Sequence, residues 1–247
     1  MTDNQAMKTL LANKDLWKIM CQFLTTIQEA AHDGNLAVLK ALCSVHGAKP
    51  WEKNNAALIA AAYNGHLDAV KLLWPLIKDQ KPELLDDDDI NPPEEDYRRA
   101  ISAATDAGHA DVVQFLCSVF RFKPTFANNT ALQTAIEHGN LHIVQILWTQ
   151  IDHTDDSLGY NPCTIIKLAA HSGNMPIFQF FWRTFPNAAN YLADYARFGA
   201  IVGNHLPVVK FLCNEVDLKQ DPKTLELAIS TAVRHRRSQI VAYLKAL

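Results

Sequence analysis

The chain has 247 residues, of which 49% are hydrophobic, so it can bury a core in one or two domains or in one repeat array. Its formal net charge of −3 argues against a general nucleic-acid binder, because neutralising phosphates requires a basic surplus. Its five cysteines lack CxxC spacing and favour a reducing, intracellular compartment over a disulfide framework.

The first predicted element is an opening helix within residues 1–24. Its apolar side chains recur at mostly helical spacing: Leu10, Leu11, Trp17, Met20 and Leu24. This segment lacks the uninterrupted apolar run of a secretory signal. No stretch of the chain reaches the ~18 apolar residues of a membrane span. We therefore expect a helix that caps whatever follows, in a cytoplasmic protein without a membrane segment.

From residue 30 onward the chain repeats itself. The segment "AAYNGHLDAVKLLW" (61–74) is the clearest copy, with small residues before a Gly-His-Leu and an apolar stripe after it. Six further versions begin at residues 30, 103, 134, 168, 199 and 231. A period in the low thirties is typical of stacked helix pairs.

Each copy turns at one residue, which we call the hinge. Glycine fills the hinge in the first five copies, at Gly34, Gly65, Gly108, Gly139 and Gly173. A helix that ends there needs a left-handed residue, which glycine and sometimes asparagine adopt at low cost. The sixth copy offers Gly203 or Asn204, which we interpret as a one-residue insertion, and Arg236 fills the last hinge.

The second helix of each copy is predicted from apolar residues two, four or five, and eight positions after the hinge. Nine positions after it, thiols and indoles alternate: Cys43, Trp74, Cys117, Trp148, Trp182 and Cys213. We interpret this slot as volume complementation between neighbouring repeats. The cysteines lie a repeat or more apart, which disfavours a shared metal ion. Lys-Pro pairs at 49–50, 81–82 and 123–124 are predicted to end second helices.

An acidic insertion separates the second and third copies. Residues 78–96, "KDQKPELLDDDDINPPEED", lengthen one interval to 43 residues. Four consecutive aspartates and a double proline predict an exposed loop. The loop is interpreted as solvated, with contact to a basic partner or a cation as the alternatives, although it lacks the alternating ligands and glycine of a calcium loop.

At this point the copies resemble the ankyrin repeat. Two segments follow its frame: "AALIAAAYNGHLDAVKLL" (56–73) and "TALQTAIEHGNLHIVQIL" (130–147). The first has the Gly-His-Leu turn and a closing pair of leucines, and the second has the opening threonine. The resemblance implies an all-α, ankyrin-like solenoid of about six to seven helix-turn-helix repeats with capping helices, over residues 25–247. Pro-Leu-His is intact in no copy and Asp-Gly hairpin tips are mostly absent, so we expect reduced hairpins. The tetratricopeptide helix pattern is not seen.

Catalytic motifs are absent from the sequence: there is no P-loop, GxSxG elbow, HExxH or kinase set. Six histidines recur at or beside the hinge, which favours hydrogen bonding between neighbouring turns: His32, His66, His109, His138, His171 and His205. We therefore expect no enzyme, no catalytic residues, no cofactor and no metal.

The resemblance implies that this chain is a monomer and binds a protein partner on its concave face. Contacts are then expected just before each first helix and near its end. These positions are Glu52, Lys53, Asn55, Tyr63, Asn64, Asp96, Tyr97, Arg98, Phe126, Asn129, Tyr160, Asn161, Tyr191, Asp194 and Arg197. Tyrosine and arginine are residue types that dominate binding hot spots.

Three hypotheses stay open from the sequence. The favoured one is a protein-interaction adaptor. A bacterial effector acting in the host cytoplasm would use the same binding surface, so only the source organism separates the two. An enzyme with a site in the groove is the third, and hydrolase and transferase assays would test it.

Overall fold

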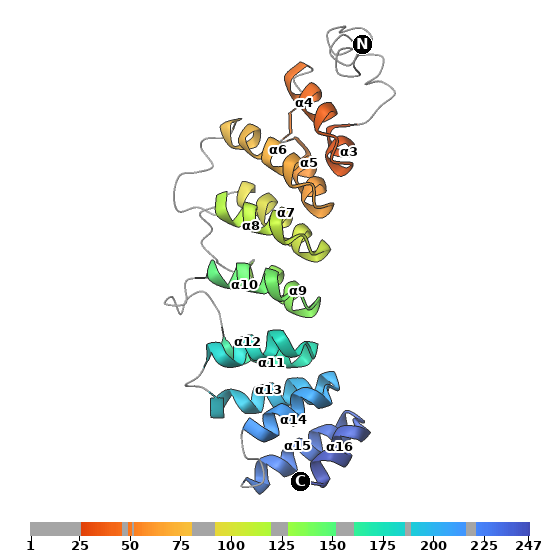
Figure 1. The fold of residues 1–247 in the computed structure, drawn as a ribbon, viewed down its shortest axis with the longest axis vertical. Helices are drawn as coiled ribbons and strands as arrows, with labels where there is room; N and C mark the ends of the chain where they lie inside the picture. Colours follow the sequence, from red (N-terminus) through yellow and green to blue (C-terminus); the bar gives the residue numbers. More distant parts are fainter. Residues whose placement is uncertain are drawn as a thin grey trace. The chain divides into compact units, whose positions relative to one another are not determined.

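The computed structural model describes eight stretches of the chain: residues 26–45, 49–50, 52–80, 92–119, 128–151, 161–185, 189–215 and 221–247 (Figure 1). Over these stretches every regular element is an α-helix, which confirms the predicted class. The chain divides into two compact units, which we call the first unit (Met1–Arg121) and the second unit (Phe122–Leu247). The predicted opening helix at 1–24 lies outside the described residues.

The first unit contains three helix pairs. They are α3 (Ile27–His32) with α4 (Leu36–Val45), α5 (Glu52–Tyr63) with α6 (Leu67–Gln80), and α7 (Pro92–Ala107) with α8 (Ala110–Val119). The first helices of these pairs contact one another in the order α3, α5, α7, and the second helices in the order α4, α6, α8. Each pair therefore buries its apolar faces against the next, as in a repeat array.

The second unit contains four helix pairs built in the same way. They are α9 (Asn128–Glu137) with α10 (Leu141–Thr149), α11 (Pro162–Ser172) with α12 (Met175–Thr184), α13 (Ala189–Gly203) with α14 (Leu206–Glu215), and α15 (Pro222–Arg234) with α16 (Ser238–Lys245). First helices again contact first helices, and second helices contact second helices. The helices described in the two units thus form seven pairs, in agreement with the predicted six to seven repeats.

The predicted hinges have the backbone that their sequence requires. The five hinge glycines, from Gly34 to Gly173, have φ between 65° and 84°. At the first four of these hinges, the hinge N–H and the next N–H donate back to carbonyls three and five residues earlier, so the end of the first helix keeps its hydrogen bonds. In the second repeat, His66 N donates to Ala61 O at 2.9 Å.

Asparagine, not glycine, occupies the left-handed position of the sixth hinge. Asn204 has φ 67°, whereas Gly203 is the last residue of α13. His205 N donates to Ala200 O at 2.8 Å, in the register of the other turns. The predicted one-residue insertion is therefore wrong, because the turn has the ordinary length with asparagine in the left-handed position. Arg236 has φ 57° and fills the last hinge as predicted.

Burial in the first helices follows the hinge register. We number positions from the hinge, with negative numbers before it. In the second to sixth repeats, positions −8, −7, −4 and −3 are all buried. In α5 these positions are Ala57, Leu58, Ala61 and Ala62, all at most 2% exposed. Small residues at −4 and −3 allow neighbouring first helices to pack closely.

The second helices bury the stripe that the periodicity predicted. In α6, Ala69, Val70 and Leu73 occupy positions +4, +5 and +8 and are almost completely buried. The residue at +2, Leu67 in this helix, is half-buried. The core of each unit therefore lies between the two layers of helices.

Helices extend into both ends of the predicted acidic loop. Helix α6 continues to Gln80, and Pro92 and Pro93 open α7. Proline suits the first turn of a helix, where its missing N–H would have no intrahelical partner. The double proline is thus a helix start, and the residues between the two helices, 81–91, lie outside the described part of the chain.

Candidate partner-binding surface

One side of every first helix faces solvent. Positions −9, −6 and −2 are exposed or half-buried in every described case, because an α-helix returns to the same side after three or four residues. We call these positions the first-helix face. In the first unit its described members are Gln28, His32, Ala56, Ile59, Tyr63, Arg99, Ser102 and Asp106.

In the first unit this face is hollowed. A cavity of about 300 Å³ lies across α3, α5 and α7. Alanines form part of its lining at Ala56, Ala60 and Ala103. Because each alanine ends at Cβ, the three together leave open space between the helices. The cavity is a candidate ligand site of the modest size expected for part of a protein interface.

Larger side chains line the rest of this hollow. Tyr63 lines it while 51% exposed, and Ile59 lies one turn earlier on the same helix. Asn64 Nδ2 donates to Ala60 O at 2.9 Å, which fixes the side chain and directs its amide oxygen away from that bond. Gln28 and His32 from α3 and Arg99 from α7 complete the lining. An apolar anchor with amide and guanidinium groups around it suits a protein segment.

In the second unit the same register carries a different surface. Positions −9, −6 and −2 are polar in α9 and α11, aromatic or aliphatic in α13, and mixed in α15, where leucine is followed by serine and arginine. The members are Thr130, Gln133, Glu137, Thr164, Lys167, His171, Tyr195, Phe198, Val202, Leu227, Ser230 and Arg234. Tyr195, Phe198 and Leu227 are 40%, 43% and 65% exposed.

Helices α11 and α13 approach closely because of two glycines. A Cβ atom added to Gly199 would collide with the backbone of Lys167, 3.0 Å from its carbonyl carbon. One added to Gly203 would collide with the carbonyl oxygen of His171. Glycine at positions −5 and −1 of α13 therefore brings the two backbones into contact.

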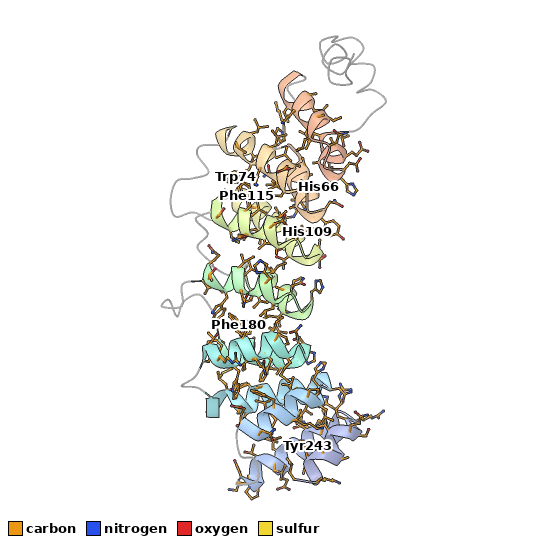
Figure 2. All side chains as sticks on the ribbon, in the orientation of Figure 1. His66, Trp74, His109, Phe115, Phe180 and Tyr243 are labelled. Atoms are coloured by element: carbon orange, nitrogen blue, oxygen red, sulfur yellow. The ribbon has the colours of Figure 1, made fainter. Side chains whose placement is uncertain are left out.

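In three repeats the residue after the hinge reaches back to the previous turn. His66 Nε2 lies 2.8 Å from His32 O, as predicted for this histidine (Figure 2). Hydrogen bonds between turns from the other predicted histidines stay a prediction. Asn174 Nδ2 donates to Gly139 O at 3.2 Å, and Arg237 donates to Val202 O in the same way. His66 lies against Gly34, where any Cβ would meet the imidazole. These hinge side chains therefore connect neighbouring repeats.

Three of the residues predicted to bind a partner are buried. Asn55, 3% exposed, has φ 54° near the start of α5. Tyr97, 6% exposed, packs edge-on against Trp74 with ring centroids 5.0 Å apart. Arg197, 4% exposed, occupies position −7, where other repeats place leucine or isoleucine. All three support the array from inside, so they leave little surface for a partner.

The other predicted residues are placed differently. Tyr63 and Asn64 line the hollow, and Arg98 is half-buried. Asn161 is exposed and accepts a hydrogen bond from Cys163 N at 2.9 Å as the N-cap of α11. Asp194 accepts one from Arg197 at 2.6 Å. The remaining side chains lie outside the described residues: Glu52, Lys53, Asp96, Phe126, Asn129, Tyr160 and Tyr191.

The indoles at position +9 contact rings of the following repeat. Trp74 meets Tyr97, Trp148 meets Phe181 at 5.2 Å, and Trp182 meets Phe211 at 6.3 Å between ring centroids. These edge-to-face contacts stabilise the stack beyond the burial of area. That thiols and indoles complement one another in volume stays a prediction.

The thiols at the same position are poorly suited to nucleophilic chemistry. Burial raises the pKa of the Cys117 thiol to about 12, and burial also raises the pKa of Cys43 and of Cys213. A thiol with a raised pKa is a weak nucleophile at neutral pH. Among the residues that the structure describes, no group of three His, Cys, Asp or Glu side chains is placed to hold a metal ion. None of the described helices is long and apolar enough to cross a membrane.

Helix pairs that turn at a left-handed residue and stack through their small and apolar faces define a repeat scaffold. Residues 76–157 match the family model for ankyrin repeats, in three copies. The chain is also 25% identical over 211 residues to the ankyrin repeat and KH domain-containing protein mask-1 of Caenorhabditis elegans. This match covers 81% of the chain but only 7% of that relative's own length. The chain thus contains ankyrin repeats, and its described helices form an all-α, ankyrin-like repeat array.

Ankyrin repeats are protein-interaction modules, and they are typically scaffolds without catalytic activity. The face that such a module offers here includes residues that reading the sequence missed, such as Ile59 and Arg99. The sequence contains a signal for these residues, because the hinge fixes where the first helix ends and so which of its residues face solvent. Counting back two, six and nine residues from each hinge locates the exposed side of every first helix.

Proposed function

We propose that the chain binds a protein partner through the hollow in the first unit, with Tyr63 as the main anchor. The observation that carries the proposal is the exposure of Tyr63 at the edge of a cavity with an alanine lining. Tyrosine combines a large apolar ring with a hydroxyl group, and such residues dominate the energetics of interfaces.

Two neighbours support this role for Tyr63. Ile59 lies four residues earlier on the same helix face and is half-buried, so the two side chains form one apolar edge. Asn64 follows Tyr63, and its hydrogen bond to Ala60 O holds the side chain in place. A preformed surface loses less conformational entropy on binding than a mobile one. Tyr63 and Asn64 are therefore the two residues that we retain from the sequence-based set.

The array acts in this proposal as an adaptor. An effector role and a cytoplasmic location stay predictions from the sequence. The cavity is open and lies along helices, whose interior N–H and C=O groups pair within the helix, so it offers a partner mainly side chains. We therefore expect recognition by shape and apolar contact.

The test compares two double variants after affinity capture of partners and their identification by mass spectrometry. Ile59→Ala with Tyr63→Ala truncates the side chains at positions −6 and −2 of α5. Gln133→Ala with Glu137→Ala truncates those at the same positions of α9 and is the matched control. We expect the first variant to weaken binding of an identified partner at least about tenfold, because truncating a hot spot costs ~2 kcal/mol or more.

The control variant should bind that partner as the wild type does. Circular dichroism and urea denaturation should show both variants folded, because exposed substitutions usually change stability by only ~0.5 kcal/mol. Equal binding by the α5 variant and the wild type would place the interface elsewhere. Tyr97 is left intact in this design, because its ring supports Trp74 and its removal would disturb the fold.

A further inference from the structure

The first-helix face of α11, α13 and α15 differs in charge from the rest of the chain. Its nine positions at −9, −6 and −2 include Lys167 and Arg234 as cations and no carboxylate. The whole chain, by contrast, has 26 acidic and 23 basic residues. A basic surface on an acidic chain is the opposite of what the average composition predicts, so it calls for a partner of negative charge.

Exposed apolar side chains share this face with the cations. Tyr195 and Phe198 on α13 and Leu227 on α15 are all more than a third exposed. Lys167 Nζ lies 5.0 Å from the centroid of the Phe198 ring. The ring of His235 meets Phe198 edge-on, with centroids 6.4 Å apart. Phe198 is thus an exposed apolar anchor with a cation directly beside it.

The backbone beneath this patch is closely packed. Gly199 follows Phe198 and lies against the carbonyl of Lys167, so α11 and α13 are held in contact at this point. The backbones that carry Lys167 and Phe198 are therefore held close together. A fixed arrangement of this kind lowers the entropic cost of association.

The nearest carboxylates of these helices lie at the other end of the patch. Asp194 and Glu226 both occupy position −10, toward the start of α13 and α15. Asp194 is already bonded to Arg197 at 2.6 Å. Val233 is also exposed, at 56%, but its position −3 belongs to the stacking side and not to this face. Both carboxylates thus lie at the start of the patch, next to Tyr195 and Leu227, whereas Lys167 lies in the middle of α11 and Arg234 at the end of α15.

We propose that Tyr195, Phe198 and Leu227, together with Lys167 and Arg234, form a second docking surface for a protein segment in which carboxylates adjoin apolar side chains. The apolar residues of that segment cover Phe198 and Leu227, and its carboxylates pair with Lys167 and Arg234. This surface lies in the second unit and uses none of the residues of the hollow. It rests on the proposed function only in assuming that the array binds proteins.

The experiment uses the full chain and a display library of short random peptides. Peptides selected on the wild type should be rich in aspartate and glutamate next to leucine or aromatic residues. A synthesised selected peptide should bind at least about tenfold more weakly to Phe198→Ala and to Lys167→Glu, as measured by fluorescence anisotropy. Its affinity should fall with added salt, because exposed charge pairs are screened.

Two control variants make each result decisive. Gln133→Ala changes position −6 of α9 and should leave peptide binding unchanged. Ile59→Ala with Tyr63→Ala should also leave it unchanged, so failure of this surface is distinguishable from failure of the hollow. Selection of basic peptides, or of the same peptides on wild type and Phe198→Ala, would overturn the proposal. So would tighter, Phe198-dependent binding of a single-stranded oligonucleotide than of the selected peptide.

Discussion

The first-helix faces of the two units share one register but present different surfaces. In the first unit, position −5 is Ala60 in α5 and Ala103 in α7, and a hollow lies between helices. In the second unit, position −5 of α13 is Gly199, whose neighbour α11 lies in backbone contact. Phe198 next to this glycine then projects from a closely packed pair of helices.

The difference separates two roles of the sequence. The hinge sets which positions face solvent, because it ends the first helix at a defined residue and so defines its phase. The side chains at −6 and −5 then decide whether that solvent face is hollow or raised. Binding specificity in such an array can therefore change without any change in the fold.

The largest effect is expected when the register itself is broken. Gly139→Val should lower the free energy of unfolding by more than about 2 kcal/mol, because a β-branched residue is strongly disfavoured in the left-handed region. Its Cβ would also lie 2.7 Å from Asn174 Nδ2, against the hydrogen bond that joins the two turns. Urea denaturation measures the change.

Asn204→Gly is the matched control for this substitution. Asn204 already has a positive φ, so glycine relieves strain there and should leave the midpoint of unfolding equal or slightly higher. If Gly139→Val unfolds at the wild-type midpoint, the hinge does not determine the register, and the comparison of the two faces fails.

The spacing of the helices gives the next largest effect. Gly199→Ala should cost about 1–3 kcal/mol, because the new methyl group collides with the Lys167 backbone, which cannot move independently of α11. Ala60→Gly, at the same position of α5, should cost only about 0.5–1 kcal/mol through helix propensity. Equal costs for the two substitutions would mean that position −5 does not determine how close the first helices lie.

The repeats and the buried stripe were predictable because their signals are local. Hinge glycines such as Gly65, and the apolar positions after them, depend on the chemistry of one turn and one helix. The sixth hinge was misread because Gly203 and Asn204 both suit a left-handed residue. The hydrogen bond from His205 to Ala200, which continues the ordinary register, decides between them.

The candidate site was less predictable because burial depends on other repeats. Tyr97 has the residue type of a binding hot spot, but Trp74, from the preceding repeat, covers it. Arg197 lies at a core position, and only the stacked helices show this. The hollow forms because Ala60 and Ala103, which precede and follow the long insertion in the sequence, line the same open space. Reading each repeat separately does not reveal that they lie near each other.

A buried arginine offers a smaller test within the second unit. Asp194→Ala should cost about 1–2 kcal/mol, because it removes the carboxylate paired with the buried Arg197 guanidinium, and the exposure of Asp194 limits the loss. Arg197→Leu restores the residue type that Leu58 and Leu132 place at −7, and should change stability by less than ~1 kcal/mol. Thermal melts measure both changes. If Arg197→Leu destabilises the protein more than Asp194→Ala does, this account is wrong.

The smallest effect is expected in the insertion, which lengthens the first unit and has no counterpart of that length in the second. Replacing residues 83–91 with a short Gly-Ser linker removes the four aspartates but keeps Pro92 as the first residue of α7. The cost of closing a loop changes by only ~0.6 kcal/mol for each doubling of its length, so the free energy of unfolding should stay within about 0.5 kcal/mol of the wild type. Circular dichroism should show the same helix content. A less cooperative transition would mean that the aspartates contribute to the packing of the first unit, and the hollow would then depend on the insertion as well as on its alanines.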